Sequence, residues 1–188
     1  MLDRSKYMDE KEYEQLVKSC QEWAAYDLRY GKLQGIKIWA LVDTALQTGL
    51  RVQELADLKA KDLDAKQRSL KIRRVKRKKK IIETLPISKD LADHLQTYLN
   101  GRKTGTIFEV GRAALQQQFH RAVKHAHLRN DLSIHACRHT LAVRLLKKTG
   151  NLRLVQMQLG HSSPQTTAIY ADVSFEDRQT ALDSLNEP

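Results

Sequence analysis

Residues 69–87 read SLKIRRVKRKKKIIETLPI, and this stretch decides the fold class of the chain. Its β-forming residues Leu70, Ile72, Ile81 and Ile82 precede Pro86 near the end, which predicts a hairpin or a small antiparallel sheet. Cationic residues fill eight of the ten positions 71–80. We expect most of this run to be a solvated patch that binds phosphate groups, with contacts from Lys71, Arg73 and Arg74.

Helical periodicity dominates on both sides of this stretch. Apolar residues recur at helical spacing in the first 30 residues and in segments at about 36–47, 51–58, 88–99, 115–126, 135–148 and 152–159. Stops are expected at Thr48-Gly49, Asn100-Gly101, Gly150 and Gly160. Further short helices are expected from Ser163-Pro164 to Tyr170 and at about 174–186. The predicted class is therefore mainly α with a small antiparallel β-sheet (α+β).

Composition points to a globular domain with a polyanionic partner. Of 188 residues, 41% are hydrophobic and 29% are charged, which suits one domain with a sizeable core. No apolar run approaches a membrane helix, and the N-terminus carries no signal core. The net charge of +11 favours nucleic acid over a basic protein without such a partner. Cys20 and Cys137 show neither disulfide nor zinc spacing, which fits a cytosolic protein.

Three more segments carry residues suited to phosphoryl chemistry. They are TGLRVQEL at 48–55, HACRH at 135–139, and LGH at 159–161 followed nine residues later by Tyr170. A phosphodiester in transfer develops negative charge on its non-bridging oxygens, and arginine meets two such oxygens with its planar fork. His135 and Arg138, three residues apart, project from one helical face. The sequence therefore predicts a site that binds and attacks a phosphodiester.

In this order and spacing, the four segments resemble the catalytic domain of the tyrosine recombinase (phage integrase) family, from about residue 8 to residue 183. The resemblance implies the tyrosine recombinase catalytic-domain fold. It also implies that Tyr170 is the nucleophile and that Lys78 in the hairpin is the general acid, with Lys76 and Lys79 as alternates. It further implies that His135 accepts the tyrosine proton. The residues that hold the phosphate are then Arg51, Arg138 and His161.

The implied function is site-specific DNA recombination through a 3′-phosphotyrosyl intermediate, without ATP, metal or cofactor. The implied partners are double-stranded DNA, further copies of the chain in a tetrameric synapse, and accessory DNA-bending proteins; no membrane is involved. A cytoplasmic, nucleoid-associated location follows. His135 and His139 could suggest a metal site, but no metalloprotease glutamate accompanies them and Arg138 would repel a cation. Glu54 is expected to support the fold or Arg51.

The expected organisation is a single catalytic domain, 1–188, without an N-terminal core-binding domain and with the helix at about 174–186 available for protomer contacts. Such a chain is either a naturally short recombinase or a catalytic fragment. Two other functions remain open at this point. One is DNA relaxation like that of a type IB topoisomerase, and the other is non-catalytic DNA binding.

Overall fold

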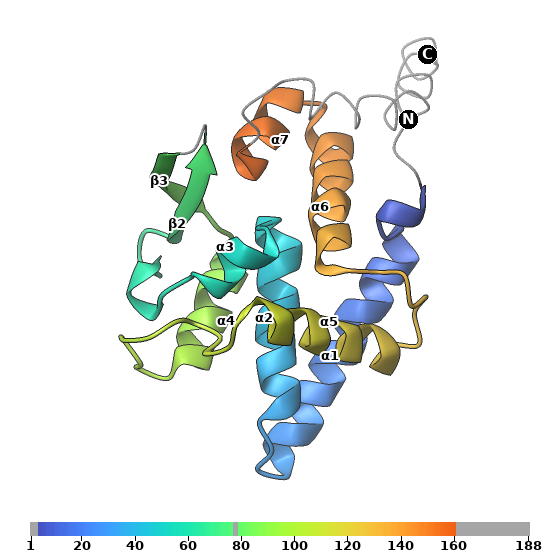
Figure 1. Ribbon diagram of the computed structural model, residues 1–188. Helices are drawn as coiled ribbons and strands as arrows, with labels where there is room; N and C mark the ends of the chain where they lie inside the picture. The colour runs from blue at the N-terminus through green and yellow to red at the C-terminus, as the bar shows by residue number, and fades with distance from the viewer. Residues whose placement is uncertain (1–3, 77–78, 161–188) are drawn as a thin grey trace, which may run out of the picture.

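The computed structural model describes residues 4–76 and 79–160, which form helices around one small sheet (Figure 1). The helices are α1 (Glu10–Arg29), α2 (Gln34–Thr48), α3 (Val52–Ala56), α4 (Lys89–Leu99), α5 (Arg112–His125), α6 (Ile134–Thr149) and α7 (Leu152–Leu159). Short 3-10 helices are η1 (Arg4–Lys6) and η2 (Ala60–Asp62). The strands are β1 (Leu63–Asp64), β2 (Ser69–Lys76) and β3 (Lys79–Pro86). The predicted α+β class is confirmed.

Local sequence signals set the ends of these helices. Ser88 begins α4, where its Oγ accepts a hydrogen bond from the backbone N–H of Leu91 at 3.1 Å. Helices α2, α6 and α7 end at glycines in the left-handed conformation, Gly49, Gly150 and Gly160, with φ of 63°, 62° and 65°. The helix stops expected from the sequence are therefore confirmed, and two of them, Gly49 and Gly160, directly precede segments that carry predicted site residues.

The sheet is antiparallel with the order β1-β2-β3. Leu70 of β2 pairs with Leu85 of β3, and Ile72 pairs with Glu83, so this face of the hairpin is mostly apolar. The ladder ends with Lys76 opposite Lys79, and Lys78 lies outside the described residues. Strand β1 was not predicted, because two residues are too short to show an alternating pattern.

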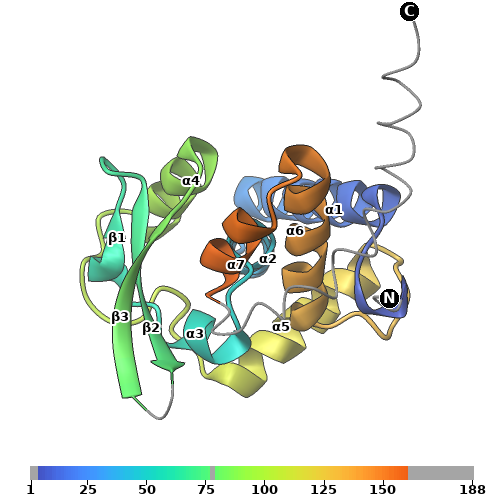
Figure 2. The same ribbon diagram turned by 90° about the horizontal axis from the view of Figure 1, so that it is seen from above.

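Two apolar clusters hold the helices together. The main core draws buried side chains from six helices, α1 to α6, and from the sheet, among them Leu16, Leu41, Leu55, Leu91 and Phe119. A separate small cluster joins α6 to α7 through Ala142, Val143, Leu146, Val155 and Leu159. Seen from above, α7 lies between α6 and the sheet (Figure 2). Helix α7 therefore packs on the body of the protein through a small apolar cluster of its own.

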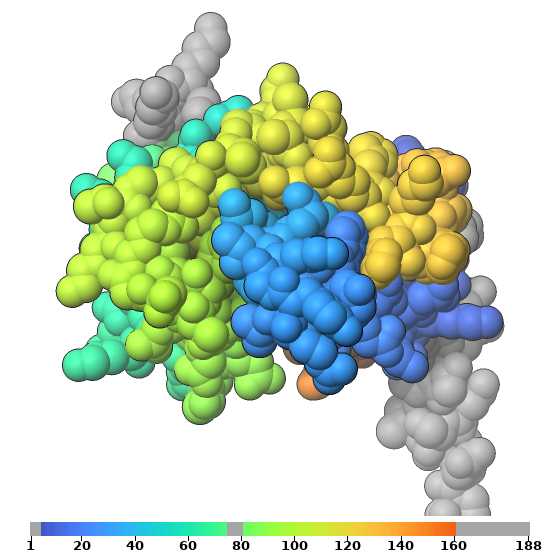
Figure 3. Space-filling model, turned by 90° about the horizontal axis from the view of Figure 1, so that it is seen from below, coloured from blue at the N-terminus to red at the C-terminus, as the bar shows by residue number. Residues whose placement is uncertain are grey.

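The turn between α1 and α2 forms the end of the molecule remote from α7 (Figure 1). Figure 3 shows this turn, in blue, standing out on the lower face, where Tyr26, Leu28, Tyr30 and Leu33 are exposed. The helices expected at 163–170 and 174–186 lie outside the described residues. Among the described helices, none combines the length and the apolar character needed to cross a membrane.

Candidate active site

Arg51 stands at the N-terminal end of α3, directly after the break that ends α2. Gly49 makes this break, and a Cβ atom there would lie 2.7 Å from Cδ2 of Leu159, so both backbone conformation and space require glycine. The backbone N–H of Arg51 donates to Oε2 of Glu54 at 2.8 Å, and Nη1 donates to Oε1 at 3.0 Å. Arg51 is nevertheless 45% exposed, so its guanidinium is held in place and reaches the surface. The prediction that Glu54 supports Arg51 is confirmed.

Arg138 is a buried arginine that joins the ends of two helices. Its Nη1 donates to the carbonyl oxygen of Gly49 at 2.7 Å, and its Nη2 donates to that of Leu159 at 2.8 Å. Both acceptors lie at helix C-termini, where unpaired carbonyls and the helix dipole favour a cation. Only 5% of Arg138 is exposed. The guanidinium therefore fixes the α2–α3 break, which carries Arg51, against the end of α7.

His135 lies in the first turn of α6, on the exposed side of the same cluster. Its pKa is lowered from the usual 6.5, first by partial burial and then by the nearby charges of Arg138 and Arg51, while Glu54 opposes the shift. The lowered pKa keeps the imidazole neutral at neutral pH, as a proton acceptor must be. The structure thus brings His135 and Arg138 together with Arg51, although they follow it by 84 and 87 residues in the sequence.

Arg74 corrects one expectation from the sequence. We expected it to be a solvated phosphate contact, but only 1% of it is exposed. Its Nη2 donates to the carbonyl oxygen of Gln158 at 3.1 Å, and its Nη1 lies 3.3 Å from Oε2 of Glu83. A buried charge is tolerated only when such partners surround it, so Arg74 is part of the protein interior. The neighbouring Arg73 is paired with Asp62 and is 31% exposed.

A sequence signal for the burial of Arg74 was present in the strand itself. Successive side chains of a strand point to opposite faces. Leu70, Ile72 and Arg74 share one face of β2 and are all buried, whereas Lys71 is exposed. The density of cations in this stretch concealed the alternation.

Three predicted site residues lie outside the described residues: Lys78, His161 and Tyr170. Two of them come shortly after described residues of the site in the sequence. His161 is the residue after Gly160, and Lys78 is four residues after Arg74. Their roles stay predictions.

His139, on α6 one turn after His135, makes the protein less stable in acid. Burial, followed by the charges of His135, Arg138 and Lys6, lowers its pKa from 6.5 to about 4. The unfolded chain therefore takes up a proton at higher pH than the folded protein does. We expect the contribution of His139 to the free energy of unfolding to be fully present above pH 6.5. It should be lost as the pH drops towards about 4, and this loss should amount to at most about 3 kcal/mol.

Urea denaturation at a series of pH values measures this effect. The variant His139→Gln removes the titrating group and should give a visibly shallower fall between the two pH values. An unchanged slope in this variant would show that His139 is not the group responsible. Within the described residues, no group of three or more His, Cys, Asp and Glu side chains is placed to hold a metal ion.

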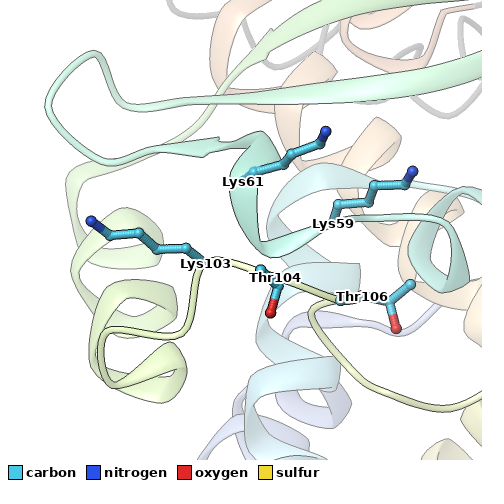
Figure 4. A pocket seen from close by; sticks show the side chains of 6 residues that line it. Lys59, Lys61, Lys103, Thr104 and Thr106 are labelled. Atoms are coloured by element: carbon cyan, nitrogen blue, oxygen red, sulfur yellow. The ribbon is translucent and has the colours of Figure 1, made fainter.

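A basic pocket of about 320 Å³ lies beside η2 and the segment after α4. Figure 4 shows Lys59 and Lys61 extending alongside each other, whereas Lys103 extends in a different direction. The three ammonium groups therefore do not converge on one point. The pocket contributes to the positive surface and does not form a compact anion site. Its lining residues are Lys59, Lys61, Lys103, Thr104, Gly105 and Thr106.

The α+β fold and the arginine-rich site can now be compared with those of known protein families. The family model of the phage integrase family matches residues 6–177, so the chain belongs to that family, as the sequence motifs predicted. The solved structures that match have the same fold. They include XerA recombinase, at TM-score 0.72 and 22% identity over 97% of this chain and 66% of that chain. The catalytic domain of bacteriophage HP1 integrase matches at TM-score 0.65 and 24% identity, over 97% of both chains.

Among curated relatives, the chain is similar to the tyrosine recombinases XerC and XerD. It is 27% identical to XerC of Chlamydia trachomatis over 168 residues, which cover 82% of this chain and 52% of the relative. It is 31% identical to XerD of Pseudomonas putida over 158 residues, covering 77% and 52% respectively. The chain thus spans about half the length of the curated relatives it matches.

Proposed function

We propose that this chain is the catalytic domain of a site-specific DNA recombinase, which cleaves and rejoins DNA strands through a 3′-phosphotyrosyl intermediate. The observation that carries the proposal is the convergence of Arg51, His135 and Arg138 in a chain that matches the phage integrase family over residues 6–177. These residues supply fixed positive charge and a neutral imidazole at one place, and a phosphodiester in transfer needs both.

The chemistry assigns one role to each predicted residue. The phenolic oxygen of Tyr170 attacks phosphorus, and the bond from phosphorus to the 5′-oxygen breaks. His135 accepts the tyrosine proton, and Lys78 protonates the leaving 5′-oxygen. Arg51, Arg138 and His161 stabilise the charge on the non-bridging oxygens; Arg138 does so through the positive charge of its buried guanidinium, which also holds the carbonyls of Gly49 and Leu159. A 5′-hydroxyl from another strand reverses the step, and the phosphotyrosine bond conserves the energy, so no ATP is required.

Surface chemistry supports DNA as the partner. Helix α5 packs beside α3, which begins at Arg51, and Figure 2 shows the two helices close together. Helix α5 has no acidic residue. It exposes donors for phosphates and base edges: Arg112, Gln116, Gln117, Arg121 and Lys124. Together with a net charge of +11, this surface suits a duplex docked over the arginine cluster.

The assembled reaction is proposed to involve several copies of the protein on DNA, as a tetrameric synapse with accessory DNA-bending proteins, at the nucleoid in the cytoplasm. One matched solved structure is XerH recombinase bound to a palindromic difH substrate, at TM-score 0.73 and 23% identity over 96% of this chain and 53% of that chain. The matched relatives are recombinases and integrases, which favours recombination over topoisomerase-type relaxation or non-catalytic binding.

Covalent trapping on nicked DNA tests the proposal. Protein incubated with a nicked duplex should give an adduct that survives a denaturing gel, and the adduct should form equally well in excess EDTA. The physical reason is that Arg51, Arg138 and His161 supply the positive charge that divalent ions supply in two-metal nucleases. A strict requirement for magnesium would contradict the proposal, and so would cleavage without any adduct on the target site of the protein.

A further inference from the structure

Arg74 of β2 binds the C-terminal end of α7. Its Nη2 donates to the carbonyl oxygen of Gln158 at 3.1 Å, in the last turn of the helix. Nη1 of the guanidinium also lies against Gly160, because a Cβ atom at Gly160 would stand 1.2 Å from it. The contact thus requires glycine at position 160 for space as well as for its positive φ.

The same guanidinium is paired with the carboxylate that holds Arg51. Nε of Arg74 lies 3.8 Å from Oε1 of Glu54, which also accepts the hydrogen bond from Arg51. On the other side, Nη1 lies 3.3 Å from Oε2 of Glu83. Burial is the main cause that lowers the pKa of Arg74, although arginine keeps its charge at any ordinary pH. A permanent buried cation therefore links β2 to α3, β3 and α7.

Two arginines together occupy the carbonyls at the end of α7. Arg74 binds the oxygen of Gln158, and Arg138 binds the oxygen of Leu159. Helix α7 otherwise rests on the small apolar cluster that it shares with α6. These two guanidinium groups therefore help to set the position of the chain as it leaves Gly160, one residue before His161.

We propose that Arg74 is a positioning residue for the strand-cleavage reaction: it holds the C-terminus of α7, up to Gly160, against the Glu54–Arg51 pair. This inference rests on the proposed function. Arg74 is 1% exposed, so it acts through neighbouring groups and not by contact with DNA. Its loss should therefore slow cleavage of bound DNA and leave binding almost unchanged.

The test compares Arg74→Met with Arg102→Met. Both variants lose an arginine whose guanidinium binds backbone carbonyl oxygens, but Arg102 binds those of Thr106 and Ile107, in the segment after α4. The cleavage rate is measured as adduct formation on nicked DNA at saturating protein, and Kd is measured separately by titration. We expect Arg74→Met to cleave at least about tenfold more slowly, since an arginine fork lost from a precise site costs on this scale. Arg102→Met should stay within about threefold of the wild type, as should Kd for Arg74→Met.

Gly160→Ala tests the same contact without removing the charge, and it replaces Arg74→Met if that variant does not fold. The matched control is Gly150→Ala. Gly150 ends α6 with φ of 62°, and no atom lies within 4 Å of the Cβ that the change would add. Both changes carry the same backbone strain, but only Gly160→Ala displaces Arg74. We expect the cleavage rate to fall at least about tenfold in Gly160→Ala and to be kept in Gly150→Ala.

The outcomes separate this inference from the proposed function. Wild-type protein that forms no adduct contradicts the proposed function itself. Wild-type protein that forms the adduct while Arg74→Met cleaves at the same rate contradicts only the role of Arg74. Equal losses in Arg74→Met and Arg102→Met, or in Gly160→Ala and Gly150→Ala, also overturn it, because they show a general effect of a lost arginine or of backbone strain.

Discussion

Replacing Tyr170 with phenylalanine should abolish the covalent adduct while DNA binding remains. The change removes only the oxygen that attacks phosphorus, and no other group of the proposed site can form a phosphotyrosyl bond. We expect the rate of adduct formation to fall by about 10⁴-fold or more, the scale for loss of a catalytic nucleophile. Denaturing gels of reactions on nicked duplex measure the adduct, and a gel-shift titration measures binding.

Tyr26→Phe is the matched control for this experiment. Tyr26 is 55% exposed in the last turn of α1, and this end of the helix is remote from α7 (Figure 1). The same loss of a phenolic oxygen at this position should leave the adduct unchanged. An adduct that persists in Tyr170→Phe would show that the nucleophile is another residue, and peptide mapping of that adduct would then locate it.

Lys78→Ala should slow cleavage of bound DNA by roughly 10²–10⁴-fold, the usual contribution of a general acid. An alkoxide leaves poorly, and a positioned ammonium group both gives it a proton and offsets its charge. A substrate with sulfur at the 5′-bridging position needs no such help, because a thiolate is a far better leaving group. We therefore expect this substrate to restore the rate of Lys78→Ala in single-turnover reactions.

Arg51→Ala is the control that gives the rescue its meaning. Arg51 is 45% exposed, so its removal should leave the fold intact and cost about 10²–10³-fold, as for one lost oxyanion donor. Sulfur should not restore this variant, because the charge on the non-bridging oxygens stays unbalanced. Rescue of Lys76→Ala or Lys79→Ala in place of Lys78→Ala would move the assignment along the hairpin. If no lysine variant is rescued, the general acid is another group, and His135 is the next candidate.

Much of the fold could be predicted because its signals are local. The periodicity of apolar residues placed the helices, and Gly49, Gly150 and Gly160 placed the ends of three of them. The hairpin followed from its β-forming residues. Strand β1 and the 3-10 helices could not be predicted in this way, because two or three residues are too few to show a period.

The candidate site, too, could be predicted only in part from the sequence. Spacing and residue type identified Arg51, His135 and Arg138, and the structure brings them together. Their hydrogen-bond partners could not be predicted, because Arg138 binds the carbonyls of Gly49 and Leu159, which are 89 and 21 residues away. Backbone carbonyls carry no sequence signature, so only the folded chain shows which of them face a given guanidinium.

The sequence alone determined the fold class, the helix ends and the family motif, because each depends on residues close together in the chain. Tertiary structure alone decided which cations of the basic stretch remain in solvent. The alternation of β2 turns Arg74 inward behind Leu70 and Ile72, but burial of its charge is tolerable only where carboxylates and a carbonyl meet it. Those partners, on α3, β3 and α7, come together only when the helices and the sheet pack against one another.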